Sequence, residues 1–303
     1  MDVRQLRYFA VLARELHFTR AAAELHIAQP ALSQQIAQLE RELGVLLFDR
    51  TRHRVRLTPA GEALLARAER IVTEVERAQG EMHAFAGVVR GRVVVGTLAS
   101  IAAFRLPAIL ARIHARYPGV ELVVHEGVTE QLVGLLVEAK LDIAFVHVTE
   151  TNLPPSLADP QVVAEPLFTE ELVLIMPSDH LLQTRTSVTP AELHDEPFIA
   201  FKAGSGLRRV LYRMSAEAQF SPRIVAESGD LGTICGLAAA GLGVSLVPRS
   251  VAEAHEPTIA LVSLATRLQR TVLLIWHQDH QLSPAADTCL AFVRADVAQH
   301  PWT

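Results

Sequence analysis

Residues 18–36 read FTRAAAELHIAQPALSQQI, and this stretch decides how the N-terminal part of the chain folds. Its alanine-rich start predicts a short helix over 20–25, with Thr19 as the N-cap. Residues 26–29 have the length of a turn, and Pro30 suits the first position of a further helix. Two short helices joined by a short turn are typical of a helix-turn-helix.

The helix that begins at Pro30 has an apolar face and a polar face. Its apolar residues recur at steps of four, three and four, so the predicted buried positions are Leu32, Ile36, Leu39 and Leu43. At about 100° per residue, Gln34 and Gln38 then point outward, with Ser33 on the flank. Glutamine can pair with adenine, and Pro30 or Ala31 can touch a thymine methyl group. The spacing leaves one alternative open, a plain helical bundle with a solvated polar face.

Residues 48–58, FDRTRHRVRLT, alternate apolar and basic side chains and predict a two-stranded hairpin. Its arginines are expected on one face, along a phosphate backbone: Arg50, Arg52, Arg54 and Arg56. Residues 1–58 hold nine arginines against six acidic residues, although the whole chain has a net charge of −5. A basic head on an acidic body is expected when only the head meets nucleic acid.

This N-terminal part, residues 1–58, is called the head below, and it resembles the head of LysR-type regulators. The matching stretches are FTRAAAEL at 18–25, QPALSQQI at 29–36, LFDR at 47–50 and LTPAG at 57–61. The resemblance implies a winged helix-turn-helix that binds double-stranded DNA through Thr19, Gln29, Pro30, Ala31, Ser33, Gln34, Gln38 and the four arginines of the hairpin. Two positions depart from the family pattern. Ala28 stands where serine is frequent, so a side-chain cap is expected to be missing, and Gln34 stands where arginine is frequent, which removes a cation.

A long helix is predicted over 59–87, with Thr58 as the N-cap and Pro59 as its first residue. Its apolar residues alternate in steps of four and three, as in a coiled-coil seam, at Leu64, Ala68, Ile71, Val75, Ala78, Met82 and Phe85. The seam indicates a partner helix, and the alternative is packing on the body of the same chain. In LysR-type proteins the equivalent helix pairs two heads, which suits an approximately palindromic DNA site.

From residue 92 the pattern changes to alternating strands and helices, which favours an α/β sheet protein. The predicted strands lie at 93–95, 121–124, 142–147, 172–176, 198–200, 243–247 and 271–276. The predicted helices lie at 106–116, 131–138, 207–220, 231–240 and 285–297. The resemblance continues here more loosely, for example in LDIA at 141–144 and GLGVSLVP at 241–248. It implies the two-lobed α/β fold of type-2 periplasmic binding proteins, with a cleft between the lobes.

The fold class expected is therefore α/β with an all-α, winged helix-turn-helix N-terminal domain. Residues 1–58 are expected to bind DNA, 59–90 to form a linker helix and hinge, and 91–303 to bind an effector. By the resemblance, one lobe combines about 92–163 with 267–303, and the other comprises about 164–266.

Ligands of open α/β sheets lie beyond the carboxyl ends of strands, near helix N-termini that favour anions. The resemblance places a small-molecule effector, expected to be anionic, at Ser100, Ile101, Thr129, His147, Phe201, Lys202 and Ser228. Lys140 and Lys202 are the only lysines, and Lys202 precedes a glycine-rich helix start where it can neutralise a carboxylate or phosphate. The alternative for Lys202 is a solvated loop charge.

Other functions have less support. The sequence has no strand-borne GxSxG elbow and no phosphate loop, so an enzyme is not expected. His277 and His280 lack a further ligand pair at zinc spacing, so neither a metal nor a cofactor is expected. Cys235 and Cys289 have apolar surroundings that favour buried, inert thiols over a redox pair. A free-standing solute-binding protein is the third alternative, against which the head and the linker helix argue.

The expected molecule is a cytoplasmic homo-oligomer, a dimer of dimers by the resemblance, with RNA polymerase as a further candidate partner. Membrane association is not expected, because the longest apolar run, 233–248, is shorter than the roughly 20 residues that cross a bilayer. Effector binding between the lobes is expected to shift the spacing of paired heads, and so the bend in the DNA.

Overall fold

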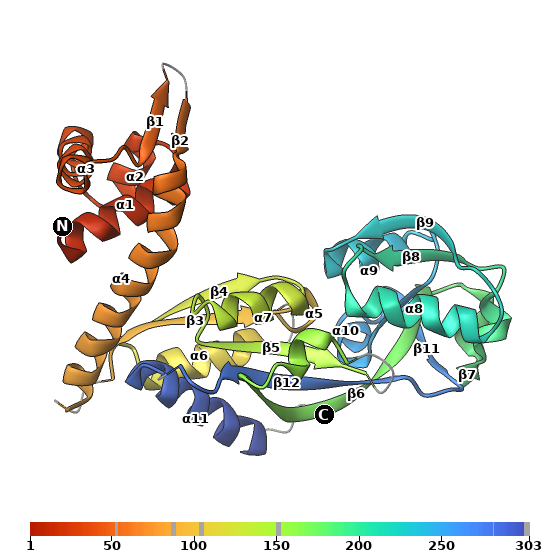
Figure 1. The fold of residues 1–303 in the computed structure, drawn as a ribbon. Helices are drawn as coiled ribbons and strands as arrows, with labels where there is room; N and C mark the ends of the chain where they lie inside the picture. Colours follow the sequence, from red (N-terminus) through yellow and green to blue (C-terminus); the bar gives the residue numbers. More distant parts are fainter. Residues whose placement is uncertain (52–53, 86–88, 103–105, 150–152, 281, 300–303) are drawn as a thin grey trace. The chain divides into compact units, whose positions relative to one another are not determined.

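The computed structural model describes residues 1–51, 54–85, 89–102, 106–149, 153–280 and 282–299 (Figure 1). Contacts divide the chain into two units, Met1–Val88 and Val89–Thr303. The first unit has one hydrophobic core and the second has two.

Three helices form most of the head: α1 (Val3–Glu15), α2 (Phe18–Glu24) and α3 (Gln29–Leu43). The prediction that Thr19 caps the second helix is wrong, because α2 begins at Phe18 and His17 Nδ1 accepts the N–H of Arg20 at 3.4 Å. The missing side-chain cap at Ala28 is confirmed. Pro30 takes the second position of α3 rather than the first.

α3 buries the predicted face except at its end. Leu32, Ile36 and Leu39 are 0 % exposed in the core of the head. Leu43 is 37 % exposed, contrary to prediction, because α3 ends there and Gly44, at φ 70, turns the chain away.

A charged residue, Glu40, is buried in the last turn of α3 at 7 % exposure. Its Oε1 accepts the backbone N–H of Leu47 at 2.9 Å and of Phe48 at 3.1 Å. A buried carboxylate is costly unless such donors satisfy it. These two bonds therefore fix the start of the hairpin against α3.

The predicted hairpin is confirmed as β1 (Phe48–Thr51) and β2 (Arg54–Leu57), which pair antiparallel. Arg56 lies opposite Asp49, whereas Arg50 lies opposite Val55, a residue that packs on the core of the head. Since paired residues share a face and successive residues alternate, positions 50 and 56 lie on opposite faces. The prediction that the arginines share one face is therefore wrong at position 50.

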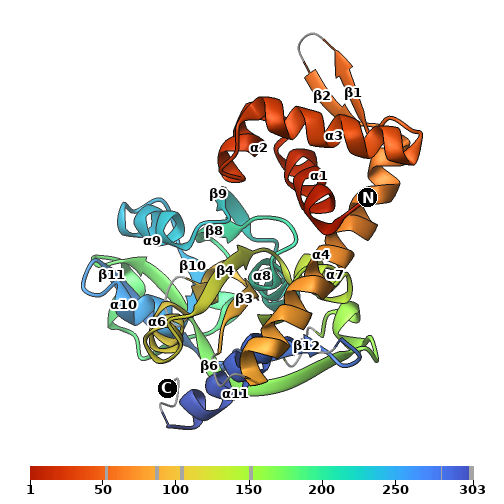
Figure 2. The ribbon, with the colours of Figure 1, turned by 90° about the vertical axis from the view of Figure 1, so that its left-hand side faces the viewer.

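The long helix is α4 (Pro59–Phe85), and Thr58 caps it by accepting the N–H of Gly61 at 3.0 Å. Gly61 is required here for space, because a Cβ at this position would lie 2.2 Å from the carbonyl oxygen of Leu47. In Figure 2, α1 runs beside the first half of α4, with which it is in contact.

The predicted seam of α4 is divided in two. Leu64 and Ala68 pack in the core of their own head, where Ala68 is 0 % exposed. Ile71 and Met82 are 40 % and 60 % exposed. The prediction of one continuous seam is therefore wrong for the first half of α4, which packs on the head of its own chain rather than on the body or on a partner helix.

The second unit is built on an eight-stranded sheet with the order β4-β3-β5-β12-β6-β11-β7, in which β10 also pairs with β6. The strands of this sheet are β3 (Gly91–Thr97), β4 (Val120–Glu126), β5 (Ile143–Val148), β6 (Val162–Pro177), β7 (Ser187–Val188), β10 (Ser245–Pro248), β11 (Ile259–Leu264) and β12 (Gln269–His277). A separate parallel pair comprises β8 (Pro197–Phe201) and β9 (Arg223–Ser228). The helices are α5 (Ala99–Ala102), α6 (Leu106–Arg116), α7 (Thr129–Val137), α8 (Gly206–Glu217), α9 (Leu231–Ala239), α10 (Arg249–Ala254) and α11 (Pro284–Gln299). Short 3₁₀ helices lie at Pro155–Ala158, Leu181–Thr184 and Pro190–Leu193.

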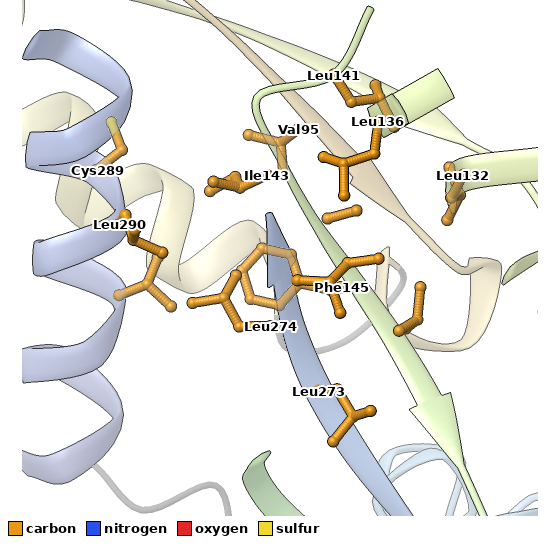
Figure 3. Close-up of a cluster of buried hydrophobic side chains, with 14 of the residues drawn as sticks. Val95, Leu132, Leu136, Leu141, Ile143, Phe145, Leu273, Leu274, Cys289 and Leu290 are labelled. Atoms are coloured by element: carbon orange, nitrogen blue, oxygen red, sulfur yellow. The ribbon is translucent and has the colours of Figure 1, made fainter. Parts of the chain in front are cut away.

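Two hydrophobic cores divide this unit into two lobes. The core of lobe 1 draws on residues from 93 to 162 and from 272 to 293, and Figure 3 shows Ile143 and Phe145 of β5 with Leu290 of α11 in it. The core of lobe 2 draws on residues from 172 to 264. β6 is 16 residues long, pairs with β12 in its first part and with β10 and β11 in its second part, and so belongs to both lobes.

Four parts of the sheets were not predicted from the sequence: β7, β9, β11 and the first half of β6. The first half of β6 contains Glu165, Pro166 and Glu170, which conceal the apolar pattern of a strand. β9 alternates exposed and half-buried residues and has no fully buried one, so its apolar pattern is weak. These strands form because their neighbours in space complete the sheet, which local sequence does not reveal.

Replacement of Glu40 tests whether this carboxylate holds the hairpin to α3. Glu40→Ala leaves two buried N–H donors unsatisfied, at about 1–3 kcal/mol each, so the head should melt at a lower temperature. Glu40→Gln keeps an acceptor oxygen and should cost less. Thermal unfolding followed by circular dichroism compares the two, and equal melting temperatures for Glu40→Ala and the unchanged chain would contradict the assignment.

Candidate nucleic-acid interface and ligand cleft

The polar face of α3 is exposed, as predicted. Thr19, Gln29, Pro30, Ala31, Gln34 and Gln38 are all exposed, and Ser33 is half-buried. Two of the amides are already engaged within α3: Gln29 Nε2 donates to Ser33 Oγ at 2.9 Å, and Gln38 Nε2 donates to Glu42 Oε1 at 3.1 Å. Within the described part of the chain, no hydrogen bond engages the Gln34 amide. Gln34 is therefore the side chain of this face best placed to bond to an outside partner.

The arginines of the hairpin are described to different extents. Arg56 is exposed on β2. Arg50 and Arg54 lie in the strands, while Arg52 lies outside the described residues. Among the hairpin arginines, Arg56 is the one whose side chain the structure describes, and its contact with a phosphate stays a prediction.

In lobe 1 the predicted effector residues lie at the carboxyl ends of parallel strands. β3 pairs in parallel with β4 and β5, and all three run toward the same edge of the sheet. Ser100 follows β3, Thr129 begins α7 after β4, and His147 is the last residue but one of β5. The three side chains are buried, at 6 %, 5 % and 4 % exposure. This edge is where ligands of α/β sheets bind.

Lobe 2 contributes the corresponding ends of β8 and β9, where Lys202 N–H donates to the carbonyl oxygen of Ser228 at 3.1 Å. Lys202 is exposed. Ser228 Oγ accepts the N–H of Asp230 at 3.1 Å and so shapes its own turn. Both positions remain predictions as effector contacts.

Two of the predicted effector residues lie in the cores. Ile101 is 1 % exposed in the core of lobe 1, and Phe201 is 6 % exposed in the core of lobe 2. Packing in the cores explains why both side chains are buried. Their contact with an effector remains a prediction.

Arg270 on β12 was not predicted as a site residue, and it is buried to 1 % exposure. Its guanidinium bonds to Glu170 Oε1 at 2.7 and 2.9 Å, and its Nη1 donates to Ser100 Oγ at 2.6 Å. Burial lowers the pKa of Arg270, and Glu170 opposes this shift. An arginine at the start of an apolar strand, with glutamates in the neighbouring strand, was the available signal.

His147 lies near two arginines, and neither of its ring nitrogens has a hydrogen-bond partner among the described residues. Burial lowers its pKa to about 3, and the charges of Arg270 and Arg209 add to the shift. The imidazole is therefore neutral at physiological pH. Thr149, two residues further on, is also buried, and its Oγ1 likewise has no partner in the described chain.

Arg209 on α8 connects lobe 2 to lobe 1. It forms an ion pair with Glu130 of α7 at 3.3 Å and donates to the carbonyl oxygen of Gly204 at 3.3 Å. A Cβ on Gly204 would lie 3.9 Å from Val128, so the two lobes approach each other closely here. The charges of Arg209 and Arg270 act on His147, and Arg270 bonds to Ser100. We use the name cleft site for these four residues together with Thr149, the buried neighbour of His147 in sequence.

Neither a metal-binding cluster nor a pair of adjacent thiols occurs among the described residues. No group of three or more His, Cys, Asp or Glu side chains there is able to hold a metal ion. The rings of His277 and His280 stack 3.6 Å apart at 11°, so their nitrogens do not converge on one point, and His277 Nδ1 accepts two backbone N–H groups. Cys235 and Cys289 are buried in different lobes, and burial raises the pKa of each thiol to about 11. Across the described chain, none of the helices has the length and hydropathy of a membrane span.

Comparison with known proteins agrees with the division of the chain into an N-terminal and a C-terminal unit. Residues 3–62 match the family of the "Bacterial regulatory helix-turn-helix protein, lysR family", and residues 86–298 match the "LysR substrate binding domain". The transcriptional regulator YnfL of Escherichia coli K12 is 36 % identical over 290 residues, covering 94 % of this chain and 95 % of that protein.

Solved structures show the same similarity over nearly the whole chain. Full-length CbnR in complex with its target DNA has a TM-score of 0.72 and 25 % identity, over 97 % of this chain and 99 % of that one. A full-length OxyR variant from Pseudomonas aeruginosa has a TM-score of 0.69 and 30 % identity, over 98 % and 94 % of the two chains.

The depressed pKa of His147 predicts a pH dependence of stability. Below pH about 6.5 the unfolded chain binds a proton at this residue, whereas the folded chain does so only near pH 3. The free energy of unfolding should therefore fall by up to about 1.4 kcal/mol per pH unit as the pH drops from 6.5.

His147→Gln, which does not titrate, should flatten this dependence. His114→Gln, at an exposed histidine of α6 in the same lobe, should leave it unchanged. Chemical unfolding between pH 7.5 and 5 measures the slopes, and identical slopes for all three proteins would refute the buried neutral state of His147.

Proposed function

This chain belongs to the LysR family of DNA-binding transcriptional regulators, and on that premise we propose that it reads specific DNA chiefly through Gln34 and answers to an anionic effector. The observation that carries the first part is the exposed, unengaged amide of Gln34 between two glutamines whose amides are bonded within α3. A free amide can bond bidentately to an adenine edge in the major groove. Thr19, Pro30, Ala31 and Ser33 complete the surface around it.

The hairpin contributes affinity rather than specificity. Arg56, exposed on β2, contacts a phosphate, and Arg50, Arg52 and Arg54 are further candidates for the same role. Such contacts position the head on the duplex without reading the sequence. CbnR, a structural relative over almost the whole chain, has been captured on its target DNA.

The effector binds in the cleft site and at the strand ends around it. Its anionic character is supported by Arg209, whose buried Nε has no partner among the described residues, and by the exposed Lys202 that follows β8. Thr129 at the N-terminus of α7 adds backbone N–H donors. Because β6 belongs to both lobes, a ligand held between them favours one lobe arrangement by its differential affinity, and thereby alters DNA binding.

The functional molecule is a cytoplasmic homo-oligomer in which α4 pairs with α4 of a second copy, and pairs of dimers give a tetramer. The exposed half of α4 supports the pairing, since a surface hollow there is lined by Arg67, Arg70, Ile71, Glu74, Val75 and Ala78. Two heads then read two half-sites, and RNA polymerase is a candidate partner at the promoter.

Two substitutions separate base reading from phosphate contact. Gln34→Ala should cost about 1–3 kcal/mol on the preferred DNA sequence and much less on other sequences. Arg56→Ala should weaken all sequences alike and make the salt dependence of log K shallower by about 0.9 per head. Fluorescence anisotropy on DNA selected by the unchanged protein measures both. Equal losses from Gln34→Ala on every sequence would argue against direct readout.

The pairing of α4 is tested at Ile71. Ile71→Glu places a charge in the apolar strip and should raise the dimer dissociation constant roughly tenfold or more. Leu181→Glu, the same kind of change at a residue that is 92 % exposed, is the matched control and should have no effect. Sedimentation equilibrium measures the constants, and an unchanged assembly in Ile71→Glu would exclude α4 as the main contact.

A further inference from the structure

The cleft site contains polar groups whose bonding capacity is not used within the described chain. His147 and Thr149 are 4 % and 8 % exposed, and Nδ1 and Nε2 of His147 and Oγ1 of Thr149 lack partners among the described residues. His147 is the last residue but one of β5, and Thr149 directly follows the end of that strand. A buried polar group without a partner costs free energy, which a bound ligand with matching groups recovers.

The two arginines of the site differ in what they offer a ligand. Arg270 is fully committed, since Glu170 neutralises it and Ser100 accepts a further bond. Arg209 has only the longer contacts, 3.3 Å each, to Glu130 and Gly204, and its buried Nε has no partner in the described residues. Arg209 is therefore the cation able to accept a new carboxylate.

The neutral imidazole sets a second requirement. Neutral His147 presents one N–H donor and one bare acceptor nitrogen, so a ligand that fills the site must offer both an acceptor and a donor. A carboxylate supplies the acceptor, and a hydroxyl group supplies the donor without adding charge. An ammonium group would also donate, but it would face Arg209 and Arg270 at close range, which is unfavourable in a buried site.

We propose that the effector is a small hydroxycarboxylate, whose carboxylate binds Arg209 Nε and whose hydroxyl donates to the bare nitrogen of His147, with Thr149 as a second hydroxyl partner. The assignment rests on the proposed function, because it deepens the chemistry of the same effector site. Arg209 and His147 come from different lobes, so a ligand that bonds to both draws the lobes together. The hydroxyl group is then what distinguishes the effector from ordinary carboxylic acids.

The test uses matched acids that differ in one group, with the full-length protein. The probes are lactate, propionate and alanine; malate, succinate and aspartate; and mandelate, phenylacetate and phenylglycine, with both enantiomers of each chiral acid. Isothermal titration calorimetry and thermal shift measure binding. We expect a hydroxy acid of at least one set to bind roughly tenfold or more tightly than its partner without the hydroxyl, and the amino acid to bind weakest.

Variants then test which residues cause the preference for hydroxy acids. His147→Leu should abolish the difference between the hydroxy acid and the deoxy acid, and Arg209→Gln should weaken both by roughly tenfold or more. Arg213→Gln is the matched control, because Arg213 lies one turn further along α8 and pairs with Glu217 at 2.8 Å. It should bind all probes as the unchanged protein does. Retained DNA binding confirms that each variant is folded.

Three results would overturn the proposal: a deoxy or amino acid that binds as tightly as its hydroxy partner, a preference that survives in His147→Leu, or a panel in which no hydroxy acid binds. Each of these leaves DNA binding intact, so the proposed function would stand. Loss of sequence-specific DNA binding by the unchanged protein would instead refute the proposed function itself.

Discussion

A buried guanidinium has to be neutralised by a nearby negative charge. In this protein Glu170 neutralises Arg270, at the point where β6 passes from lobe 1 to lobe 2. Arg270 lies opposite Glu170 in the register of β12 and β6, at 1 % exposure. Its other contact is Ser100 of α5 in lobe 1, while the second oxygen of Glu170 accepts the N–H of Ser250 of α10 in lobe 2 at 3.3 Å. Removing one partner of such a pair typically costs about 3–5 kcal/mol. One ion pair therefore joins elements of both lobes at the point where the sheet continues between them.

The charge of Arg270 also acts on His147. Burial lowers the pKa of His147 to about 3, and the charges of Arg270 and Arg209 add to this shift, so the histidine stays neutral in the folded protein. Our proposal that the effector combines a negative charge with a neutral donor rests on this neutral imidazole and on the Nε of Arg209, which has no partner among the described residues. A thiol sensor would need a reactive thiolate. Cys235 and Cys289 lie in separate cores of the same unit, and burial raises the pKa of each thiol to about 11, so neither forms the thiolate that reacts with peroxide.

In the head, packing decides which amide is available to DNA. Leu32, Ile36 and Leu39 anchor one side of α3, and Glu40 ties its end to the hairpin. The opposite side is left exposed, where pairing within the helix engages Gln29 and Gln38 but not Gln34. On this exposed side α3 thus presents the amide of Gln34, which no hydrogen bond engages among the described residues.

The sequence by itself determined the family, the two-part organisation and the face of α3 that is exposed, because these follow from helical periodicity and from motifs that are local in the chain. It also placed Ser100, Thr129 and His147 at strand ends, since the strand order of an α/β sheet carries such positions to one edge. Local signals failed in three places. His17 rather than Thr19 caps α2, because either of two neighbouring side chains could take that role. Leu64 and Ala68 pack in the core of their own head, and position 50 lies on the other face of the hairpin from position 56, because contacts with the other elements of the head and the register of the hairpin decide these orientations. Only the tertiary structure revealed Arg270 and Arg209 as members of the cleft site and Glu170 as the partner of Arg270. Arg270 is 100 residues from Glu170 and 170 residues from Ser100 in sequence, so these residues meet only when the chain is folded.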